Sequence, residues 1–262
     1  LAELQPGNDR PIEGLCIDSR QALPGDIFFA LAGASTHGLR FLKEVIDRGV
    51  AVVLWEPDEQ LTEDVIPLNN AAVPIVAVEN LTQKLGVIAS RFYGEPSKNL
   101  SVVGITGTDG KTSCSLFMME ALNQAGIKTG VIGTLGYGLP GSMQTATHTT
   151  PDAIRVHKLL QEMLEQGSQS VVMETSSHGL DQGRVNGVDF DIAVLTNLTR
   201  DHLDYHGDLK SYKQAKGILF NFPNLNYAVL NLDDEFGKQI AKNIDSREKV
   251  LGFAMESVDA DN

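Results

Sequence analysis

The sequence contains little of what disulfide-rich or membrane-spanning proteins require. Its two cysteines, Cys16 and Cys114, match no metal-ligand or redox spacing, so we expect two buried free thiols and a reducing, cytoplasmic location. Its longest apolar runs, such as 49–55, fall far short of the ~20 residues that cross a bilayer. Residues 1–6 lack the basic and then apolar order of a signal peptide.

Positive charge is also scarce. The chain has 21 Lys and Arg against 34 Asp and Glu, which gives a formal net charge of −13. Surfaces that bind nucleic acids or anionic membranes need clustered basic residues. We therefore expect neither a nucleic acid nor a membrane among the partners.

The remaining composition is that of an ordinary globular protein. The 262 residues are 42% hydrophobic and 21% charged, which allows two domains, each with its own core, at the usual size of about 100–150 residues. The chain begins at Leu1 without an initiator methionine, so we expect that it does not start at the beginning of a gene product.

Short apolar runs alternate with segments of helical period, which predicts an α/β fold with mostly parallel sheets. In the first third the pattern predicts strands at 27–31, 51–54 and 75–78, helices at 38–48 and 81–92, and a linker at 94–97. The later strands are expected at 101–105, 128–132, 170–173, 192–196, 227–230 and 249–253, and the later helices at 111–125, 152–166, 211–222 and 234–243. We predict a small α/β domain, 1–95, followed by a larger doubly wound domain with a phosphate loop, 96–262.

A glycine-containing turn joins the predicted strand 101–105 to the predicted helix 111–125. Such a turn directs several backbone N–H groups at one point, where they can bind the phosphates of a nucleotide. Lys111 would reach the β- and γ-phosphates, and the Thr112 hydroxyl would hold Mg²⁺. The usual spacing would place a glycine at Ile105, so this is a variant of the phosphate loop.

Residues 106–112, Thr-Gly-Thr-Asp-Gly-Lys-Thr, resemble the phosphate loop of the Mur ligases, the ATP-dependent amide-forming enzymes of peptidoglycan synthesis. The loop alone does not distinguish these from folylpolyglutamate and cyanophycin synthetases. Further segments resemble the Mur ligase branch that adds the third peptide residue to UDP-N-acetylmuramoyl-L-alanyl-D-glutamate. They are 17–20, 24–30, 149–152, 174–185, 196–207 and 212–216. The resemblance implies a uridine-binding first domain and an ATP-binding central domain.

The implied reaction activates a substrate carboxylate with the γ-phosphate of ATP, and an amine then attacks the acyl phosphate. The implied ATP-binding residues are Gly107, Thr108, Asp109, Gly110, Lys111, Thr112 and Ser113. Asp109 departs from the family pattern, which usually has asparagine at this position. Its negative charge would weaken ATP binding unless a cation compensates for it.

The resemblance also implies Mg²⁺ ligands and catalytic residues. The Mg²⁺ ligands are Thr112, Glu174, His202 and Lys216 as a carbamate, and the catalytic residues are Lys111, Glu174, His202 and Lys216. Chemistry alone leaves alternatives open, because Glu174 could cap the following helix, His202 could be only a solvated side chain, and Lys216 could be an ordinary surface lysine. A carbamate needs a neutral amine, and therefore a lysine whose pKa is lowered.

For the UDP-linked substrate the resemblance implies residues in both domains. They are Ile17, Ser19, Ala34, Ser35, Thr36, His148, Thr149, Thr150, Ser176, Gln182 and Arg184. His148 stands where this branch often has asparagine. We expect Thr149 and Thr150 also to cap a helix that has Pro151 as an early residue, whereas Arg184 could be a plain surface arginine.

Mur ligases have a third, C-terminal domain, which contributes to the ATP site and selects the amino acid. No further βαβ unit follows the predicted strand 249–253, so we expect this domain and the end of the central domain to be absent. We expect a cytoplasmic monomer that binds the UDP-linked substrate with little turnover. Its expected ligands are ATP, UDP-N-acetylmuramoyl-L-alanyl-D-glutamate and, with the missing domain, meso-diaminopimelate. A lysine-adding ligase, a cyanophycin-synthetase-like ligase and a binding module without turnover stay open.

Overall fold

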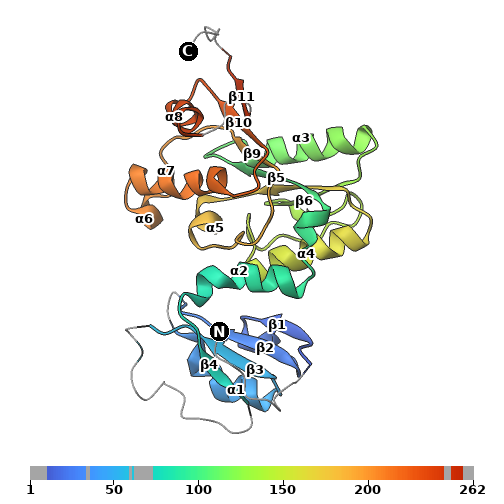
Figure 1. Ribbon diagram of the computed structural model, residues 1–262, viewed down its shortest axis with the longest axis vertical. Coiled ribbons are helices and arrows are strands. Elements are labelled where there is room, and N and C mark those ends of the chain that lie inside the picture. The colour runs from blue at the N-terminus through green and yellow to red at the C-terminus, as the bar shows by residue number, and fades with distance from the viewer. Residues whose placement is uncertain (1–10, 34–35, 59–60, 62–72, 245–248, 256–262) are drawn as a thin grey trace. The chain divides into compact units, whose positions relative to one another are not determined.

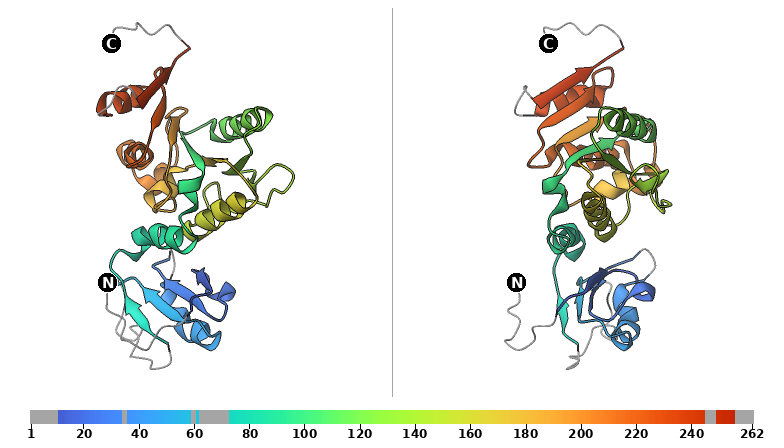
Figure 2. Two further views of the ribbon diagram at one scale, coloured as in Figure 1. Left: turned by 45° about the vertical axis from the view of Figure 1, so that its right-hand side comes forward. Right: turned by 90° about the vertical axis from the view of Figure 1, so that its right-hand side faces the viewer.

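A computed structural model describes residues 11–33, 36–58, 61, 73–244 and 249–255. The chain divides into two compact units, Leu1–Lys84 and Leu85–Asn262 (Figure 1 and Figure 2). The boundary lies inside helix α2 (Leu81–Phe92), before the segment 94–97. That segment leads into the short 3-10 helix η3 (Pro96–Asn99) of the second unit.

The first unit contains a sheet of four parallel strands in the order β1-β2-β3-β4. The predicted helix 38–48 is a 3-10 helix, η2 (Gly38–Phe41), that continues as α1 (Leu42–Asp47). Val45 of α1 lies in one buried cluster with Phe28 and Val53 of the sheet. The strands are β1 (Gly14–Cys16), β2 (Asp26–Ala30), β3 (Val52–Trp55) and β4 (Ile75–Ala77), of which only β1 was not predicted.

The second unit contains a seven-stranded sheet in the order β11-β10-β9-β5-β8-β6-β7, parallel except for β7 at one end. The strands are β5 (Ser101–Thr106), β6 (Thr129–Gly133), β7 (Gly136–Gly138), β8 (Ser170–Glu174), β9 (Ile192–Leu195), β10 (Tyr227–Asn231) and β11 (Val250–Phe253). The helices are α3 (Lys111–Gln124), α4 (Ala153–Glu165), α5 (Ser177–Asp181), α6 (Leu203–His206), α7 (Leu209–Gly217), η4 (Ile218–Asn221) and α8 (Glu235–Asn243).

Helices cover both faces of this sheet (Figure 2). Because successive strand residues point to opposite faces, alternate residues belong to different cores. Val103, Val172 and Val194 pack with Cys114 and Met118 of α3 on one face. The residues that alternate with them join a larger core with α4, α5 and α8 on the other face. The predicted doubly wound α/β fold is therefore confirmed.

Two local predictions are wrong. Helix α4 begins at Ala153, and the carboxylate of Asp152 caps it by accepting a hydrogen bond from the Arg155 N–H at 3.0 Å. Pro151 therefore lies outside the helix. Cys16 is buried as expected, but Cys114 is only partly buried, because it lies in the first turn of α3 near the sheet edge. Among the described residues, no helix is both long and apolar enough to cross a membrane.

Candidate functional site

The carboxyl ends of β9, β5 and β8 are neighbours in the centre of the second sheet. Ile105 of β5 pairs with Glu174 of β8, and Thr106 of β5 pairs with Leu195 of β9. In doubly wound folds, ligands bind outside the carboxyl ends of such strands. The loop 107–110, which follows β5, is therefore placed beside the predicted residues that follow β8 and β9.

Two glycines give this phosphate loop, residues 107–110, its shape. Gly107 has a φ of 150°, and a Cβ added to it would lie 1.9 Å from Thr196 Oγ1, so a larger residue does not fit. Gly110 has a φ of 82° and is the N-cap of α3, where it offers no side chain to cap the helix. The first N–H groups of α3 carry the positive end of the helix dipole and suit phosphate oxygens.

The two residues after β9, Thr196 and Asn197, form hydrogen bonds with both the backbone N–H and the carbonyl oxygen of Asp109. Asn197 Oδ1 accepts a hydrogen bond from Asp109 N at 3.0 Å, and Asn197 Nδ2 donates to Asp109 O at 3.2 Å. Thr196 Oγ1 donates to the same carbonyl oxygen at 2.6 Å. The conformation of the loop is thus fixed by the neighbouring strand, while Asp109 itself is exposed to solvent.

Lys111 and Lys216 converge on one backbone carbonyl. Lys111 Nζ donates to Gly107 O at 2.9 Å, and Lys216 Nζ, which comes from α7, donates to the same oxygen at 2.6 Å. Burial lowers the pKa of Lys111, and burial together with the charge of Lys111 lowers the pKa of Lys216 to about 7. Lys216 is 1% exposed, so the alternative of a surface lysine is wrong.

Tyr212 supports both the buried lysine and the loop. Lys216 Nζ lies 4.5 Å from the centroid of the Tyr212 ring, a distance at which the ring face attracts a cation. The Tyr212 hydroxyl lies 3.2 Å from Thr108 Oγ1, within hydrogen-bond distance. The ring therefore links α7 to the loop that would hold the phosphates.

Glu174 is the last residue of β8 and is 1% exposed. Its Oε2 accepts a hydrogen bond from Thr112 Oγ1 at 2.8 Å, and its Oε1 accepts one from Thr134 N at 2.8 Å. Gly133 leaves room for this carboxylate, since a Cβ added there would lie 2.2 Å from Glu174 Oε1. A buried carboxylate is thereby held beside the hydroxyl of the first turn of α3.

The turn after β8 is capped by Ser176 rather than by Glu174. Ser176 Oγ accepts a hydrogen bond from Gly179 N at 3.1 Å, so the alternative of Glu174 as the helix cap is wrong. Thr150 Oγ1 donates to Glu174 O at 2.8 Å and accepts from Ser176 N at 3.0 Å. Thr149 Oγ1 lies 3.0 Å from Thr134 Oγ1. These two threonines therefore connect the site to the start of α4. The expectation that they cap this helix is wrong, because Asp152 caps it.

Gln182 and Arg184 form a second cluster next to Thr150. Arg184 Nε and Nη2 both donate to Gln182 Oε1, at 3.0 and 2.6 Å, and Nη1 donates to Thr150 O at 2.8 Å. Arg184 is partly buried, so it is not the plain surface arginine that the sequence left open. Its contacts with two other predicted substrate-binding residues, Gln182 and Thr150, suit recognition of an anionic group.

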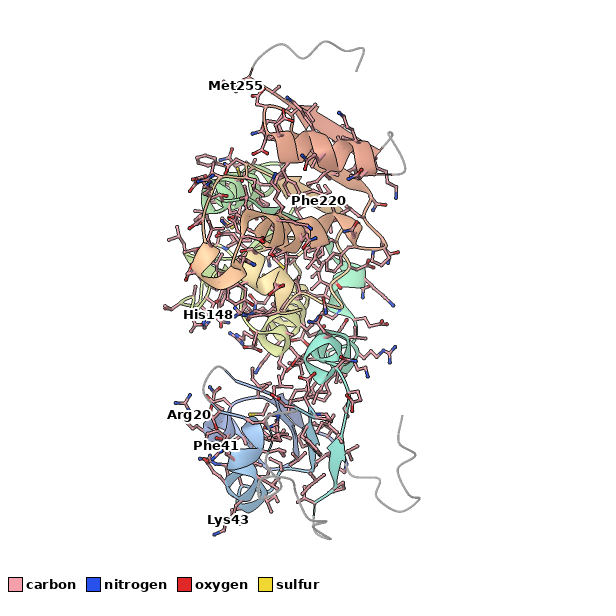
Figure 3. All side chains as sticks on the ribbon, turned by 90° about the vertical axis from the view of Figure 1, so that its left-hand side faces the viewer. Arg20, Phe41, Lys43, His148, Phe220 and Met255 are labelled. Carbon is pink, nitrogen blue, oxygen red and sulfur yellow. The ribbon has the colours of Figure 1, made fainter. Side chains whose placement is uncertain are left out.

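The structure does not bring His202 into contact with the other predicted Mg²⁺ ligands. His202 has a φ of 51°, its ring centroid lies 4.9 Å from that of His178, and its Nε2 lies 3.4 Å from Asp201 Oδ2. No group of three or more His, Cys, Asp or Glu residues is arranged as a metal site in the part of the chain that the structure describes. His148 is exposed on the segment before α4 (Figure 3).

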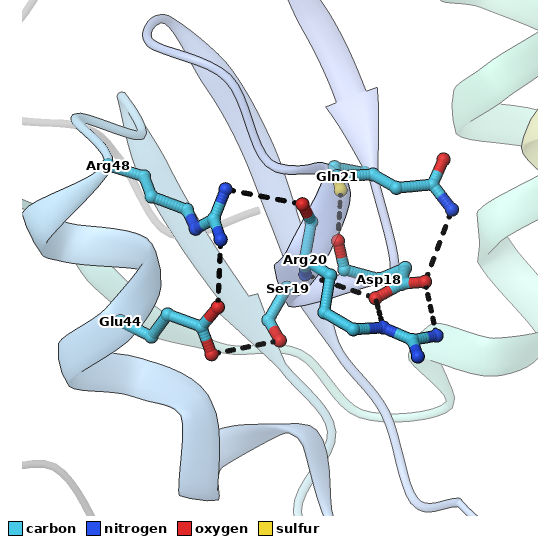
Figure 4. A network of polar contacts seen from close by, with 7 residues as sticks. Asp18, Ser19, Arg20, Gln21, Glu44 and Arg48 are labelled. Atoms are coloured by element: carbon cyan, nitrogen blue, oxygen red, sulfur yellow. Dashed lines mark hydrogen bonds and ion pairs between the residues drawn. The ribbon is translucent and has the colours of Figure 1, made fainter.

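In the first unit, Ser19 belongs to a polar network that joins the 3-10 helix η1 (Ser19–Gln21) to α1 (Figure 4). Ser19 Oγ donates to Glu44 Oε2 at 3.3 Å, and Arg48 Nη2 donates to Glu44 Oε1 at 3.1 Å. Arg48 Nη1 also donates to Arg20 O at 3.2 Å. Glu44 and Arg48 thereby fix the turn that carries Ser19.

The other predicted residues of the first unit form no common cluster with Ser19 among the described contacts. Ile17 is 37% exposed, and the Thr36 carbonyl accepts a hydrogen bond from Gly33 N at 3.0 Å. Ala34 and Ser35 lie outside the described residues.

Several residues that shape the site were not predicted. Thr134 follows the end of β6, so a search of every strand end could have found it. Three further residues lie on helices, and their own sequence surroundings do not mark them as site residues, because the fold brings them there. They are Asp181 of α5, Tyr205 of α6 and Tyr212 of α7.

Comparison with models of known protein families finds that both units match domains of the same family. Residues 11–93 match the Mur ligase family catalytic domain, and residues 105–262 match the Mur ligase middle domain. A protein from Alkalilimnicola ehrlichii named UDP-N-acetylmuramoyl-L-alanyl-D-glutamate–2,6-diaminopimelate ligase is 47% identical over 97% of this chain and 51% of its own length. The chain spans about half the length of the curated relatives it matches.

Two solved structures also resemble the chain. A structure of a ligase with that same name superposes with a TM-score of 0.80 at 32% identity, over 94% of this chain and 49% of the other. The structure of a MurF ligase from Thermotoga maritima in complex with ADP has a TM-score of 0.59 at 20% identity, over 95% of this chain and 51% of the other. The second likeness shows a shared fold.

Proposed function

The chain belongs to the Mur ligase family, and on that premise we propose that it forms the substrate-binding and nucleotide-binding parts of an ATP-dependent ligase. The proposed reaction joins 2,6-diaminopimelate to UDP-N-acetylmuramoyl-L-alanyl-D-glutamate, as the name of the relative from Alkalilimnicola ehrlichii states for that protein. The observation that carries the proposal is the buried Glu174 carboxylate, 2.8 Å from the Thr112 hydroxyl in the first turn after the phosphate loop.

In the proposed reaction, an oxygen of the substrate carboxylate bonds to the γ-phosphorus of ATP, and the bond to the β–γ bridging oxygen breaks, releasing ADP. The amine nitrogen then attacks the acyl carbon, phosphate leaves, and the nitrogen loses a proton. Both reactants of the first step are anions, so positive groups must offset their repulsion. Lys111 and the N-terminus of α3 support this role, because both lie at the phosphate loop.

Thr112 and Glu174 fit a Mg²⁺ ion. Hydroxyl and carboxylate oxygens are the hard ligands that Mg²⁺ prefers, and water and phosphate oxygens usually complete its shell. The Thr134 N–H already holds the other carboxylate oxygen, which orients Glu174 towards Thr112. When bound, the ion would neutralise charge on the phosphates.

We further propose Lys216 as a carbamate and His202 as ligands of a second Mg²⁺. Burial favours the neutral amine that carbamate formation requires, and the pKa of Lys216, about 7, supports it. The Lys216 amine also faces the phosphate loop through its hydrogen bond to Gly107. His202 enters this proposal from the family resemblance, and in the structure its Nε2 lies 3.4 Å from Asp201 Oδ2.

For the UDP-linked substrate, we propose that the first unit binds the uridine part through Ile17, Ser19 and the segment 34–36. In the second unit the muramoyl-peptide part would meet residues that lie around Thr150. They are His148, Thr149, Thr150, Ser176, Gln182 and Arg184. The hydrogen bonds among Thr150, Ser176 and Arg184 support a common role for them. The domain limits 1–95 and 96–262, a monomeric state and a cytoplasmic location stay predictions.

Isothermal titration calorimetry of the 262-residue chain tests the proposal. We expect binding of a non-hydrolysable ATP analogue with Mg²⁺, and separately of UDP-N-acetylmuramoyl-L-alanyl-D-glutamate. Lys111→Ala should weaken binding of the analogue by at least about tenfold, since a charge-assisted contact to phosphate contributes about 1.5–3 kcal/mol. Lys158→Ala, which changes an exposed lysine of α4, is the matched control. Binding of an aspartate–arginine polymer in place of the UDP-linked substrate would contradict the proposed substrate.

A further inference from the structure

Four side chains from two neighbouring segments, 181–184 and α6, form one continuous series of hydrogen bonds. The Tyr205 hydroxyl of α6 donates to Asp181 Oδ2 at the end of α5, at 2.8 Å. Gln182 Nε2 donates to the Tyr205 hydroxyl oxygen at 3.1 Å. Gln182 Oε1 accepts two hydrogen bonds from Arg184, at 3.0 and 2.6 Å. This series of hydrogen bonds therefore runs from the Asp181 carboxylate to the Arg184 guanidinium.

The two end groups fix which partner donates in each hydrogen bond of this series. A carboxylate only accepts hydrogen bonds and a guanidinium only donates them, whereas a phenol and a carboxamide can do both. Asp181 therefore accepts the hydrogen bond that the Tyr205 hydroxyl donates, which leaves the phenol oxygen to accept from Gln182. The amide nitrogen of Gln182 then faces Tyr205, and its oxygen faces Arg184.

This direction matters because the two ends of a glutamine amide have nearly the same shape. If the amide were turned over, its NH₂ group would face the donors of Arg184, and neither group could accept. The Tyr205 hydroxyl, which accepts from the amide nitrogen, therefore acts together with the Arg184 donors to favour the orientation in which Gln182 holds the guanidinium. Arg184 Nη1 is held separately by Thr150 O at 2.8 Å.

Packing keeps Tyr205 in place. Its ring centroid lies 4.2 Å from the ring centroid of His178 and 4.7 Å from that of His206. Tyr205 is 41% exposed, and the partial burial of its ring, together with the hydrogen bond to Asp181, raises its pKa, so the phenol keeps its proton at neutral pH. The group that donates to Asp181 is therefore present across the range in which the protein would work.

We propose that Tyr205 and Asp181 are positioning residues, which set the Gln182 amide and, through it, the Arg184 guanidinium for the substrate's anionic group. The inference rests on the proposed function, in which Gln182 and Arg184 bind the UDP-linked substrate. Neither Tyr205 nor Asp181 needs to touch the substrate itself.

The decisive variant is Tyr205→Phe, which removes one hydroxyl and keeps the ring. We expect its affinity for UDP-N-acetylmuramoyl-L-alanyl-D-glutamate to fall about five- to tenfold, as for the loss of one well-placed hydrogen bond, with no change for the ATP analogue. Tyr227→Phe, which changes an exposed tyrosine at the start of β10, is the control and should match the wild type. An unchanged affinity of Tyr205→Phe, or an equal loss for both ligands, would overturn the inference.

Two substitutions of Asp181 test whether its oxygen, which accepts from Tyr205, is what matters. Asp181→Asn keeps an oxygen that accepts from Tyr205 and should retain most of the affinity. Asp181→Ala removes that oxygen and should behave like Tyr205→Phe. Equal affinities of the asparagine and alanine variants would count against a hydrogen-bonding role.

A spectroscopic measurement separates this inference from the proposed function. The Gln182 side-chain amide signal, assigned by its loss in Gln182→Ala, should shift and exchange faster with water in ligand-free Tyr205→Phe, but not in Tyr227→Phe. If the wild type does not bind the UDP-linked substrate, the proposed function fails, while this signal still decides whether Tyr205 positions Gln182. An unchanged signal refutes the positioning role.

Discussion

His157 should make the second unit lose stability as the pH falls. Its side chain lies in α4, is fully buried, and donates from Nε2 to Asn186 O at 2.9 Å. Within the described part of the chain, Nδ1 has no hydrogen-bond partner, so a proton there would be buried without an acceptor. Burial accordingly lowers the pKa of His157 from 6.5 to about 4.

The direction of the effect follows from which state binds the proton. Between pH 6.5 and 4 the unfolded chain is protonated at His157 and the folded chain is not, so unfolding takes up a proton. The contribution is fully present above pH 6.5 and declines as the pH falls towards 4. With these two pKa values, the free energy of unfolding should decrease by about 1 kcal/mol at pH 5.5 and by about 2–3 kcal/mol at pH 4.5.

His157→Gln is the informative variant, because glutamine can still donate a hydrogen bond near the Nε2 position but does not titrate. Urea denaturation at several pH values between 4.5 and 7.5 gives the unfolding free energies of both proteins. Circular dichroism follows the secondary structure of both units, and the fluorescence of the single tryptophan, Trp55 in β3, separates out the unfolding of the first unit. His148→Gln, which changes an exposed histidine, is the control.

The difference in unfolding free energy between wild type and His157→Gln should change by about 2–3 kcal/mol across this pH range. A difference that stays constant from pH 7.5 to 4.5 would refute the reasoning. A pH dependence of the same size in the His148→Gln comparison would also refute it.

Two further predictions concern charges at the phosphate loop. Asp109→Asn should tighten binding of the ATP analogue by about two- to fivefold, because it removes an exposed negative charge near the phosphates, and calorimetry showing unchanged or weaker binding would count against this. Lys216 should form a carbamate increasingly between pH 6 and 8, since its pKa of about 7 leaves about a tenth of the amine neutral at pH 6 and about nine tenths at pH 8. A ¹³C signal from labelled bicarbonate should report this and disappear in Lys216→Arg, and intact masses showing only free amine under CO₂-replete conditions would contradict it.

The sequence predicts the larger elements of the fold well, because their signals are local. Alternating apolar runs and helical periods are properties of each segment, and the strands and helices they indicate are present in both units. The same holds for Lys111 and Thr112, which a strand, a glycine turn and a helix start place together. Pairing of the neighbouring strand ends then places Glu174 beside them.

What the sequence does not predict depends on contacts between distant segments. Strand β7 (Gly136–Gly138) has two glycines among its three residues, and it exists because it pairs with β6. Lys216 has the local pattern of a surface residue, and only the position of α7 against the phosphate loop buries it. The orientation of Gln182 depends on Tyr205, which follows it by more than twenty positions in the sequence.

The convergence of Lys111 and Lys216 on the Gly107 carbonyl has a consequence for calorimetry. At pH 7, in CO₂-free solution, about half of the Lys216 amines are neutral, and an anion bound beside them would favour the charged form. Nucleotide binding would then draw up to about half a proton per chain from the buffer. The heat observed would include the ionisation enthalpy of that buffer, so titrations in phosphate and in Tris would give different apparent enthalpies for the same binding event.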